Sequence, residues 1–244
     1  MPETKEITVF KYEELEGRAR DKARDWYMST LDYEWWDSDY ANAKEEGKNR
    51  GFDIDDIRFR GFASQGDGAS WTGRIIVRDF VNWMLAQPED SPQYRRIGGD
   101  RHRYTVLQEI IEADYGSEMP GLFERCTWVD QRSFHYSHSG TMQVDEINYS
   151  CLYDIMDSDD PDDDETIPAG VLKGASIKEL AKGIDAEGLF YDLRELMETE
   201  AKEYADSIYK QLEATWDGMC EDEYIADTAD ANDWRFDENG KMVF

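Results

Sequence analysis

The chain has 244 residues, of which 40% are hydrophobic and 13% aromatic, so it is long enough and apolar enough to form a packed core. Fifty-six acidic residues outnumber 27 basic residues and give a formal net charge of −29. Such an excess repels a nucleic-acid backbone over a Debye length of about 10 Å, which disfavours direct nucleic-acid binding. No apolar run is long enough to span a bilayer, and the N-terminus has no apolar signal segment. We therefore expect a cytoplasmic protein that makes no membrane contact.

The first fifty residues predict a short strand and two helices. Ile7 and Val9 alternate with polar residues, as in a strand. From Glu13 to Tyr27 apolar residues recur at three- and four-residue spacing, which predicts an amphipathic helix. A second helix is predicted over residues 33–48, with glycines at its end.

Two antiparallel strands are predicted at residues 54–62 and 71–80, on either side of a glycine-rich loop. A helix is expected to begin near Val81, and Pro88 and Pro92 are expected to break the chain. Apolar residues between positions 104 and 111 then mark a helix that ends near residue 116.

Residues 122–153 predict a meander of strands. The strand candidates are residues 126–129, 134–138 and 141–149, with Ser139-Gly140 as a two-residue hairpin turn. Residues 157–165 hold seven acids in nine positions, and like charges at that density predict an exposed loop over about 157–167.

The C-terminal part predicts a long helix over residues 186–216 with an acidic outer face. A short helix at 221–231 and a hairpin turn at Asn239-Gly240 follow. The whole pattern predicts an α+β fold, with an antiparallel β-sheet packed against several helices, in a single domain of residues 1–244.

Four segments occur in the same order as in a family of phage and prophage proteins, some of them labelled antitoxin-like. They are Lys22-Ala-Arg-Asp-Trp-Tyr27, Glu34-Trp-Trp-Asp37, Gly61-Phe-Ala-Ser-Gln-Gly-Asp-Gly-Ala-Ser70, and Ala231-Asn-Asp-Trp-Arg-Phe236 with Glu238-Asn-Gly240. The chain resembles this family over most of its length. The resemblance implies an origin in a mobile element and a setting in the host cytoplasm, and it carries over no active site. The acids at 157–165 depart from the family's pattern.

The glycine loop has two interpretations. Gly66 and Gly68 could let backbone N–H groups approach an anion. However, a dinucleotide-binding loop needs a third glycine and a helix after it, whereas Trp71 and a predicted strand follow here. A structured turn between strands is therefore favoured. A ligand-binding loop stays open as an alternative, with the candidate residues Ser64, Gln65, Asp67, Ser70 and Trp71.

Metal and catalytic sites are not predicted. His135 and His138 lie three apart on a predicted strand, so their side chains are expected on opposite faces. The acids from Asp157 onward lack the glycine and glutamate of an EF-hand loop, because position 6 is Asp162 and position 12 is Pro168. No serine or cysteine has a recognisable base nearby in the sequence. We expect no metal, no cofactor and no enzyme activity.

The acidity itself predicts a partner. B-DNA carries one charge per roughly 1.7 Å of its axis, so a surface row of 29 charges corresponds to about 50 Å of duplex. We therefore expect a nucleic-acid mimic that inhibits a basic host defence protein, such as a CRISPR complex, a restriction enzyme or another nuclease. The candidate contact residues are Asp157, Asp159, Asp160, Asp162, Asp163, Asp164, Glu165, Glu195 and Glu198.

Three alternatives stay open. The acids can form only a solvated surface. The glycine loop can make the protein a module that binds a nucleotide or a signalling molecule, or a small enzyme. The protein can also be an antitoxin that binds a basic toxin.

Overall fold

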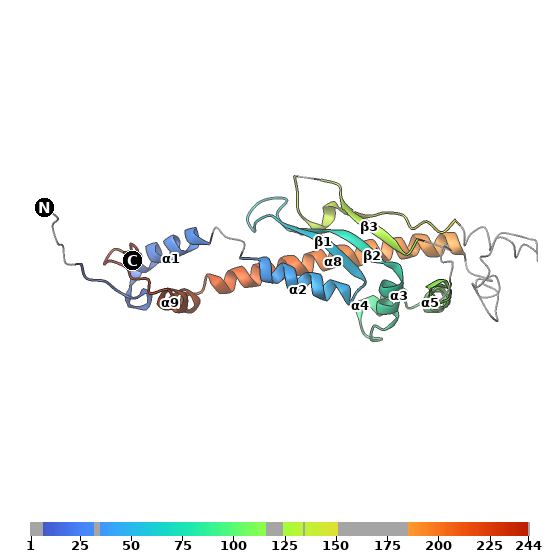
Figure 1. Ribbon diagram of the computed structural model, residues 1–244, viewed down its shortest axis with the longest axis horizontal. Helices are drawn as coiled ribbons and strands as arrows, with labels where there is room; N and C mark the ends of the chain where they lie inside the picture. Colours follow the sequence, from blue (N-terminus) through green and yellow to red (C-terminus); the bar gives the residue numbers. More distant parts are fainter. Residues whose placement is uncertain (1–6, 32–34, 116–123, 134, 151–184, 244) are drawn as a thin grey trace, which may run out of the picture. The chain divides into compact units, whose positions relative to one another are not determined.

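The computed structural model describes residues 7–31, 35–115, 124–133, 135–150 and 185–243. Within these residues the chain forms seven α-helices and one four-stranded antiparallel sheet, which confirms the predicted α+β class (Figure 1). Contacts divide the chain into two compact units, residues 1–40 with 210–244 and residues 41–209. The boundaries fall within helices α2 (Asp37–Lys48) and α8 (Ala186–Met219). Because compactness does not test whether each unit folds alone, the single domain stays a prediction.

The larger unit is built on the sheet. Its strands are β1 (Phe52–Phe59), β2 (Ala69–Ile76), β3 (Cys126–Gln131) and β4 (Met142–Val144), in the order β1-β2-β3-β4 with each neighbour antiparallel. The strands predicted on either side of the glycine loop are thus confirmed, with shifted bounds. Side chains alternate between a buried face and a polar face, as period-two patterning requires.

Helix α8 packs against the buried face of the sheet. The indole of Trp71 in β2 is fully buried, and its Nε1 donates to the Ala201 carbonyl on α8 at 3.1 Å. The hydroxyl of Tyr204 donates to the Ala43 carbonyl on α2 at 2.6 Å. These bonds satisfy polar groups inside the core, where an unpaired donor would cost about 1–3 kcal/mol. The predicted long C-terminal helix is confirmed.

Three further helices complete the larger unit: α3 (Val77–Leu85), α4 (Pro92–Ile97) and α5 (Arg101–Tyr115). The predicted break is confirmed, because α3 ends before Pro88 and a new helix, α4, begins at Pro92. The missing N–H of Pro92 belongs to the first helical turn, where no partner is needed. Ser91 caps the helix by accepting from the Tyr94 N–H at 3.0 Å.

The predicted meander is only partly right. Strand β4 pairs with β3, but residues 135–138 form no strand and Ser139–Thr141 is a short 3-10 turn, η2. The Thr141 N–H and hydroxyl both donate to the His138 carbonyl, at 2.9 and 2.8 Å, and close the chain locally. The predicted Ser139-Gly140 hairpin is therefore wrong, because the backbone there bonds within its own turn.

The smaller unit joins the two ends of the chain. It contains η1 (Tyr12–Glu14), α1 (Gly17–Thr30) and α9 (Asp222–Ala231). The helix predicted from Glu13 is wrong in its first turn, because Leu15 and Glu16 are extended. The core residues come from both termini and are Tyr12, Leu15, Ala23, Tyr27, Leu31, Met219, Ile225, Ala229 and Phe236.

Phe236 links the two termini of this unit. It forms antiparallel bridges with Phe10 and with Met242. The predicted strand at Ile7 and Val9 is wrong, since Phe10 alone forms a bridge in that stretch. The predicted turn at Asn239-Gly240 is confirmed, because Gly240 has φ +77° and its N–H donates to the Asp237 carbonyl at 3.0 Å.

Candidate functional site

The acids predicted to contact a partner fall into two groups. Seven of them, at positions 157–165, lie outside the described residues. The other two, Glu195 and Glu198, lie on α8 and meet in one ion-pair network around Arg194. The Arg194 guanidinium lies 2.5 Å from the Glu195 carboxylate and 3.1 Å from the Glu198 carboxylate, and its Nε donates to the Val144 carbonyl at 3.0 Å.

Among the described residues, the Glu198 carboxylate has three partners. It also accepts from Lys202 Nζ at 2.5 Å and from the Val144 N–H at 3.3 Å, and its side chain is 16% exposed. Burial would raise the pKa of its carboxyl, but the hydrogen bonds with Lys202 and Val144 and the nearby charges outweigh burial and hold the pKa below its ordinary value. Glu198 thus joins α8 to β4, whereas Glu195 is 53% exposed.

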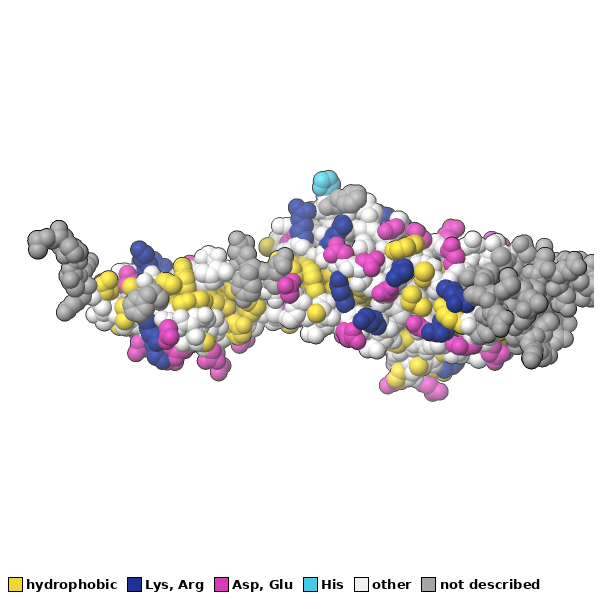
Figure 2. All heavy atoms as spheres, viewed as in Figure 1, with side chains coloured by type: hydrophobic (Ala, Val, Ile, Leu, Met, Phe, Trp, Pro, Cys, Tyr) yellow, Lys and Arg dark blue, Asp and Glu magenta, His cyan; other side chains and the backbone are white. Residues whose placement is uncertain are grey.

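Exposed acids that form no salt bridge with the described residues lie just before and just after residues 151–184. Asp145, Glu146, Asp185 and Glu187 are all exposed, and within the described ranges none of them lies in a salt bridge. By contrast, most arginines of the larger unit lie beside an acid, as Arg74 does beside Asp53 at 2.5 Å. Figure 2 shows basic and acidic side chains interspersed over this unit. Exposed acids that form no salt bridge with a described residue also occur elsewhere in this unit, as at Glu89, Asp90 and Glu109, so those near residues 151–184 are one group among several.

The glycine loop is held by hydrogen bonds among its own residues. The Asp67 carboxylate accepts from the backbone N–H groups of Ala63 and Ser64, at 2.8 and 2.5 Å. The Asp67 N–H donates to the Ser64 carbonyl at 3.1 Å, and the Arg60 N–H donates to the Gly68 carbonyl at 3.1 Å. The Asp67 carboxylate therefore occupies two backbone donors of the loop and places a negative charge there, which disfavours an anionic ligand.

The same loop packs tightly against residues 136–138. A Cβ atom at Gly66 would overlap the Tyr136 ring, and one at Gly68 would lie 2.7 Å from the His138 Cβ. Gly66 also has φ +96°. The glycines are thus required for close approach and for backbone conformation.

The five candidate ligand residues of this loop do not share one surface. Ser64 and Gln65 are exposed, and Asp67 is half-buried. Ser70 and Trp71 are 1% and 0% exposed. The structure therefore brings the two exposed residues together at the tip of the loop and places the two last residues inside the fold.

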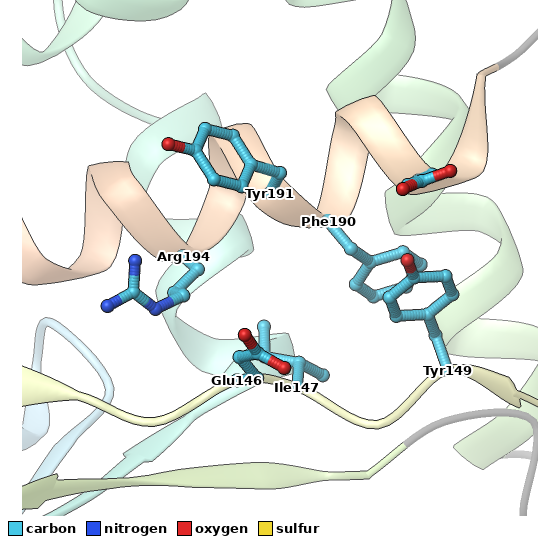
Figure 3. Close-up of a pocket in the computed structure, with 7 residues that line it drawn as sticks. Glu146, Ile147, Tyr149, Phe190, Tyr191 and Arg194 are labelled. Atoms are coloured by element: carbon cyan, nitrogen blue, oxygen red, sulfur yellow. The ribbon is translucent and has the colours of Figure 1, made fainter.

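A pocket of about 220 Å³ lies at the N-terminal end of α8; we call it the α8 pocket. One wall comes from the segment after β4 and the other from the first turns of α8 (Figure 3). The rings of Tyr149 and Phe190 lie face to face, with centroids 4.6 Å apart and planes 1° apart. Its lining residues are Glu146, Ile147, Tyr149, Glu187, Phe190, Tyr191 and Arg194.

The α8 pocket has an apolar floor and a negative rim. Ile147 and Phe190 are 4% and 2% exposed, whereas Tyr191 is 62% exposed. Glu146 and Glu187 contribute two carboxylates, and the charge of Arg194 is balanced by Glu195 and Glu198. The lining therefore has a net negative charge beside aromatic faces, a combination that favours a cation.

A second pocket, of about 300 Å³, lies between α2, α3 and α4. Its lining residues are Glu46, Asn49, Arg50, Trp83, Gln87 and Gln93. The Arg50 guanidinium lies 4.5 Å from the ring centroid of Tyr204 and 3.2 Å from the Glu46 carboxylate. Because Glu46 balances its charge, Arg50 gives this pocket no net positive charge for a phosphate.

The prediction that His135 and His138 lie on opposite faces of a strand is wrong, because residues 135–138 do not form a strand. Among the described residues, no three His, Cys, Asp or Glu side chains gather closely enough to hold a metal ion. The helices of the described part also include none with the length and hydropathy to cross a membrane.

A family model described as "Domain of unknown function (DUF8835)" matches residues 35–222. The chain belongs to the DUF8835 family. No curated protein and no solved structure matches the chain. The matched range contains the whole sheet, the glycine loop and the α8 pocket.

The DUF8835 range leaves out most of the smaller unit. The segments Lys22–Tyr27 and Ala231–Gly240, which carry part of the resemblance to phage proteins, lie outside residues 35–222. Sequence reasoning missed the α8 pocket, since Glu146, Tyr149 and Tyr191 come from segments that meet only in the folded chain. The one available signal was Tyr191, an aromatic residue on the polar side of the long helix.

Proposed function

We propose that this DUF8835 protein is a phage-encoded accessory protein that binds and inhibits a basic, nucleic-acid-handling host protein. The observation that carries the proposal is a group of exposed acids that form no salt bridge within the described residues: Asp145, Glu146, Asp185 and Glu187. They stand at the two ends of a segment whose sequence adds the seven acids of residues 157–165. Together they supply a dense negative charge for a partner that normally holds DNA or RNA.

The mechanism is competition for a basic groove. Basic grooves hold counterions or nucleic-acid phosphates, and an acidic protein that displaces them gains the same counterion-release free energy that drives DNA binding. Such binding weakens as salt rises. The resemblance to phage proteins supports a target in host defence, namely a CRISPR complex, a restriction enzyme or another nuclease, in the host cytoplasm.

The decisive test starts from capture of the host partner and its identification. The purified partner is then tested for inhibition and for competition by duplex DNA. We expect the captured protein to be basic, its nucleic-acid binding to be blocked, and DNA to displace the DUF8835 protein. A partner that binds DNA and this protein at the same time contradicts the proposal.

Charge variants test the electrostatic mechanism. Replacing the seven acids at 157–165 by their amides should weaken binding at least about tenfold, and raising salt from 50 to 200 mM should weaken it further. The matched control removes seven exposed acids elsewhere: Asp21, Asp25, Glu89, Asp90, Glu109, Asp206 and Glu213. Equal losses in both variants would indicate only general charge attraction.

An antitoxin that binds a basic toxin is the second candidate, and the same acids favour it. The identity of the captured partner separates the two. The glycine loop does not favour the nucleotide-binding alternative, because the Asp67 carboxylate accepts from the Ala63 and Ser64 N–H groups and would repel a phosphate. Calorimetry with a panel of nucleotides tests it directly, and we expect no heat of binding.

A further inference from the structure

The size of the α8 pocket sets the scale of its occupant. Its volume of about 220 Å³ is below the roughly 300–1,000 Å³ of typical small-molecule sites. The pocket is therefore matched to one side chain of a partner. Its floor is apolar, because Ile147 and Phe190 are almost fully buried.

The aromatic walls favour a flat or cationic group. The Tyr149 ring is stacked on the Phe190 ring, so its position is fixed by the packing of α8 (Figure 3). Tyr191 stands on the same helix and is 62% exposed. A cation over the face of an aromatic ring gains about 0.5–1 kcal/mol when exposed and about 2 kcal/mol when desolvated.

The charges of the lining select a cation. Glu146 and Glu187 are exposed carboxylates that lie in no salt bridge within the described residues. The one cation of the lining, Arg194, already contacts Glu195, Glu198 and the Val144 carbonyl. A positively charged group in the pocket would therefore be attracted by the Glu146 and Glu187 carboxylates. Its repulsion by Arg194 is offset because Glu195 and Glu198 pair with Arg194.

We infer that the α8 pocket receives an arginine side chain of the basic partner, an inference that rests on the proposed function. A guanidinium is planar, so it can stack on the exposed Tyr191 ring while its edge donates to a carboxylate at two points. A lysine ammonium lacks both features. Arginine is also the residue that basic proteins use for phosphates, so a pocket for it gives a nucleic-acid mimic a specific contact point.

The experiment uses a short Gly/Ser peptide with one central arginine as the probe. Binding to the full chain is followed by NMR, through the ring resonances of its tyrosines, at 0.15 M salt. Two further peptides replace the arginine. Citrulline removes the positive charge and keeps the size of the side chain, whereas lysine keeps the charge and lacks the planar guanidinium. We expect the citrulline peptide to bind at least about tenfold more weakly, which corresponds to about 1.4 kcal/mol. Equal binding of the arginine and citrulline peptides overturns the inference, and so does tighter binding of the lysine peptide.

Paired variants locate the bound peptide. Glu146→Gln with Glu187→Gln should weaken the arginine peptide about tenfold, and Tyr191→Ala should weaken it severalfold. The matched control, Asp206→Asn with Glu213→Gln, removes two exposed acids further along α8 and should change binding less than about twofold. If both double variants weaken the arginine peptide equally, the peptide does not bind in the α8 pocket. That result overturns the inference and leaves the proposed function untouched. A captured partner that ignores these variants also overturns the inference, even if the peptide binds the pocket, because its arginine then lies elsewhere. The proposed function fails separately, when the partner binds DNA and this protein at the same time.

Discussion

The glycine loop and the α8 pocket both contain exposed polar groups, but they differ in what those groups contact. In the loop, the Asp67 carboxylate accepts from two N–H groups of the loop itself. In the pocket, Glu146 and Glu187 lie in no salt bridge within the described residues. The polar groups of the loop therefore stabilise the loop itself, whereas the two carboxylates of the pocket remain available to a ligand.

A distinctive sequence motif is therefore not the same as a site with polar groups available for binding. The loop has the most distinctive sequence of the chain because close packing against residues 136–138 demands glycine. The pocket residues are unremarkable in sequence because two distant segments build it.

The largest effect is expected for Trp71→Ala. Trp71 follows the loop directly, is fully buried, and packs with its ring centroid 5.1 Å from that of Phe52. Its removal leaves a large cavity and deletes the hydrogen bond that the indole adds to the Ala201 carbonyl, so the free energy of unfolding should fall by about 3–5 kcal/mol. Urea unfolding measures it. The matched control is Trp128→Ala on the next strand, which is 50% exposed and should cost less than about 1 kcal/mol. Similar losses for both would contradict a structural role specific to Trp71.

Gly68→Ala should have the next largest effect. The added Cβ would lie 2.7 Å from the His138 Cβ and 3.0 Å from both the His138 Cα and the Ser137 carbonyl oxygen, and backbone atoms cannot rotate away. We expect a loss of about 2–3 kcal/mol in the free energy of unfolding. Gly99→Ala is the control, because no atom lies within 4 Å of its Cβ position. An unchanged stability for Gly68→Ala would show that the loop moves freely and is open to a ligand.

The sequence was sufficient for those parts of the fold that local patterns determine. Apolar spacing along residues 186–216 predicted α8 because one face of a long helix must be buried. Apolar segments on either side of the glycine loop predicted β1 and β2. By contrast, residues 135–138 have a strand-like composition, yet they pack against Gly66 and Gly68 instead of pairing in the sheet. That choice depends on a tertiary contact.

The candidate site was harder to predict, for the same reason. Glu195 and Glu198 both fall on the polar side of α8, so a helical pattern gives them similar roles. Only the fold shows that Lys202 and the Val144 N–H hold Glu198, while Glu195 stays exposed. Tyr149 and Tyr191 are 42 positions apart and meet at one pocket through the packing of α8.

Glu198→Gln should cost about 1–2 kcal/mol at neutral pH, because a buried charge-assisted network loses its anion. The pKa of Glu198 is lowered in the folded state, so the ionised carboxylate stabilises the fold above the ordinary glutamate pKa. This contribution is lost as the pH falls through the lowered folded value. Urea unfolding should therefore show a difference between wild type and variant that shrinks at acidic pH. Glu195→Gln, one turn earlier and exposed, should change stability by less than about 0.5 kcal/mol at any pH.

The smallest effect on stability is expected for Tyr191→Ala combined with Glu187→Gln in the α8 pocket. Both side chains are exposed, and within the described ranges neither forms a side-chain hydrogen bond or salt bridge. The free energy of unfolding should change by less than about 0.5 kcal/mol, because no buried contact is lost. A loss above about 1 kcal/mol would show that these residues serve the fold, as Asp67 does in the glycine loop, and would remove the contrast between the two regions. An unchanged stability together with weaker binding of the arginine peptide would instead separate binding from folding, since the same two substitutions then act on one and not on the other.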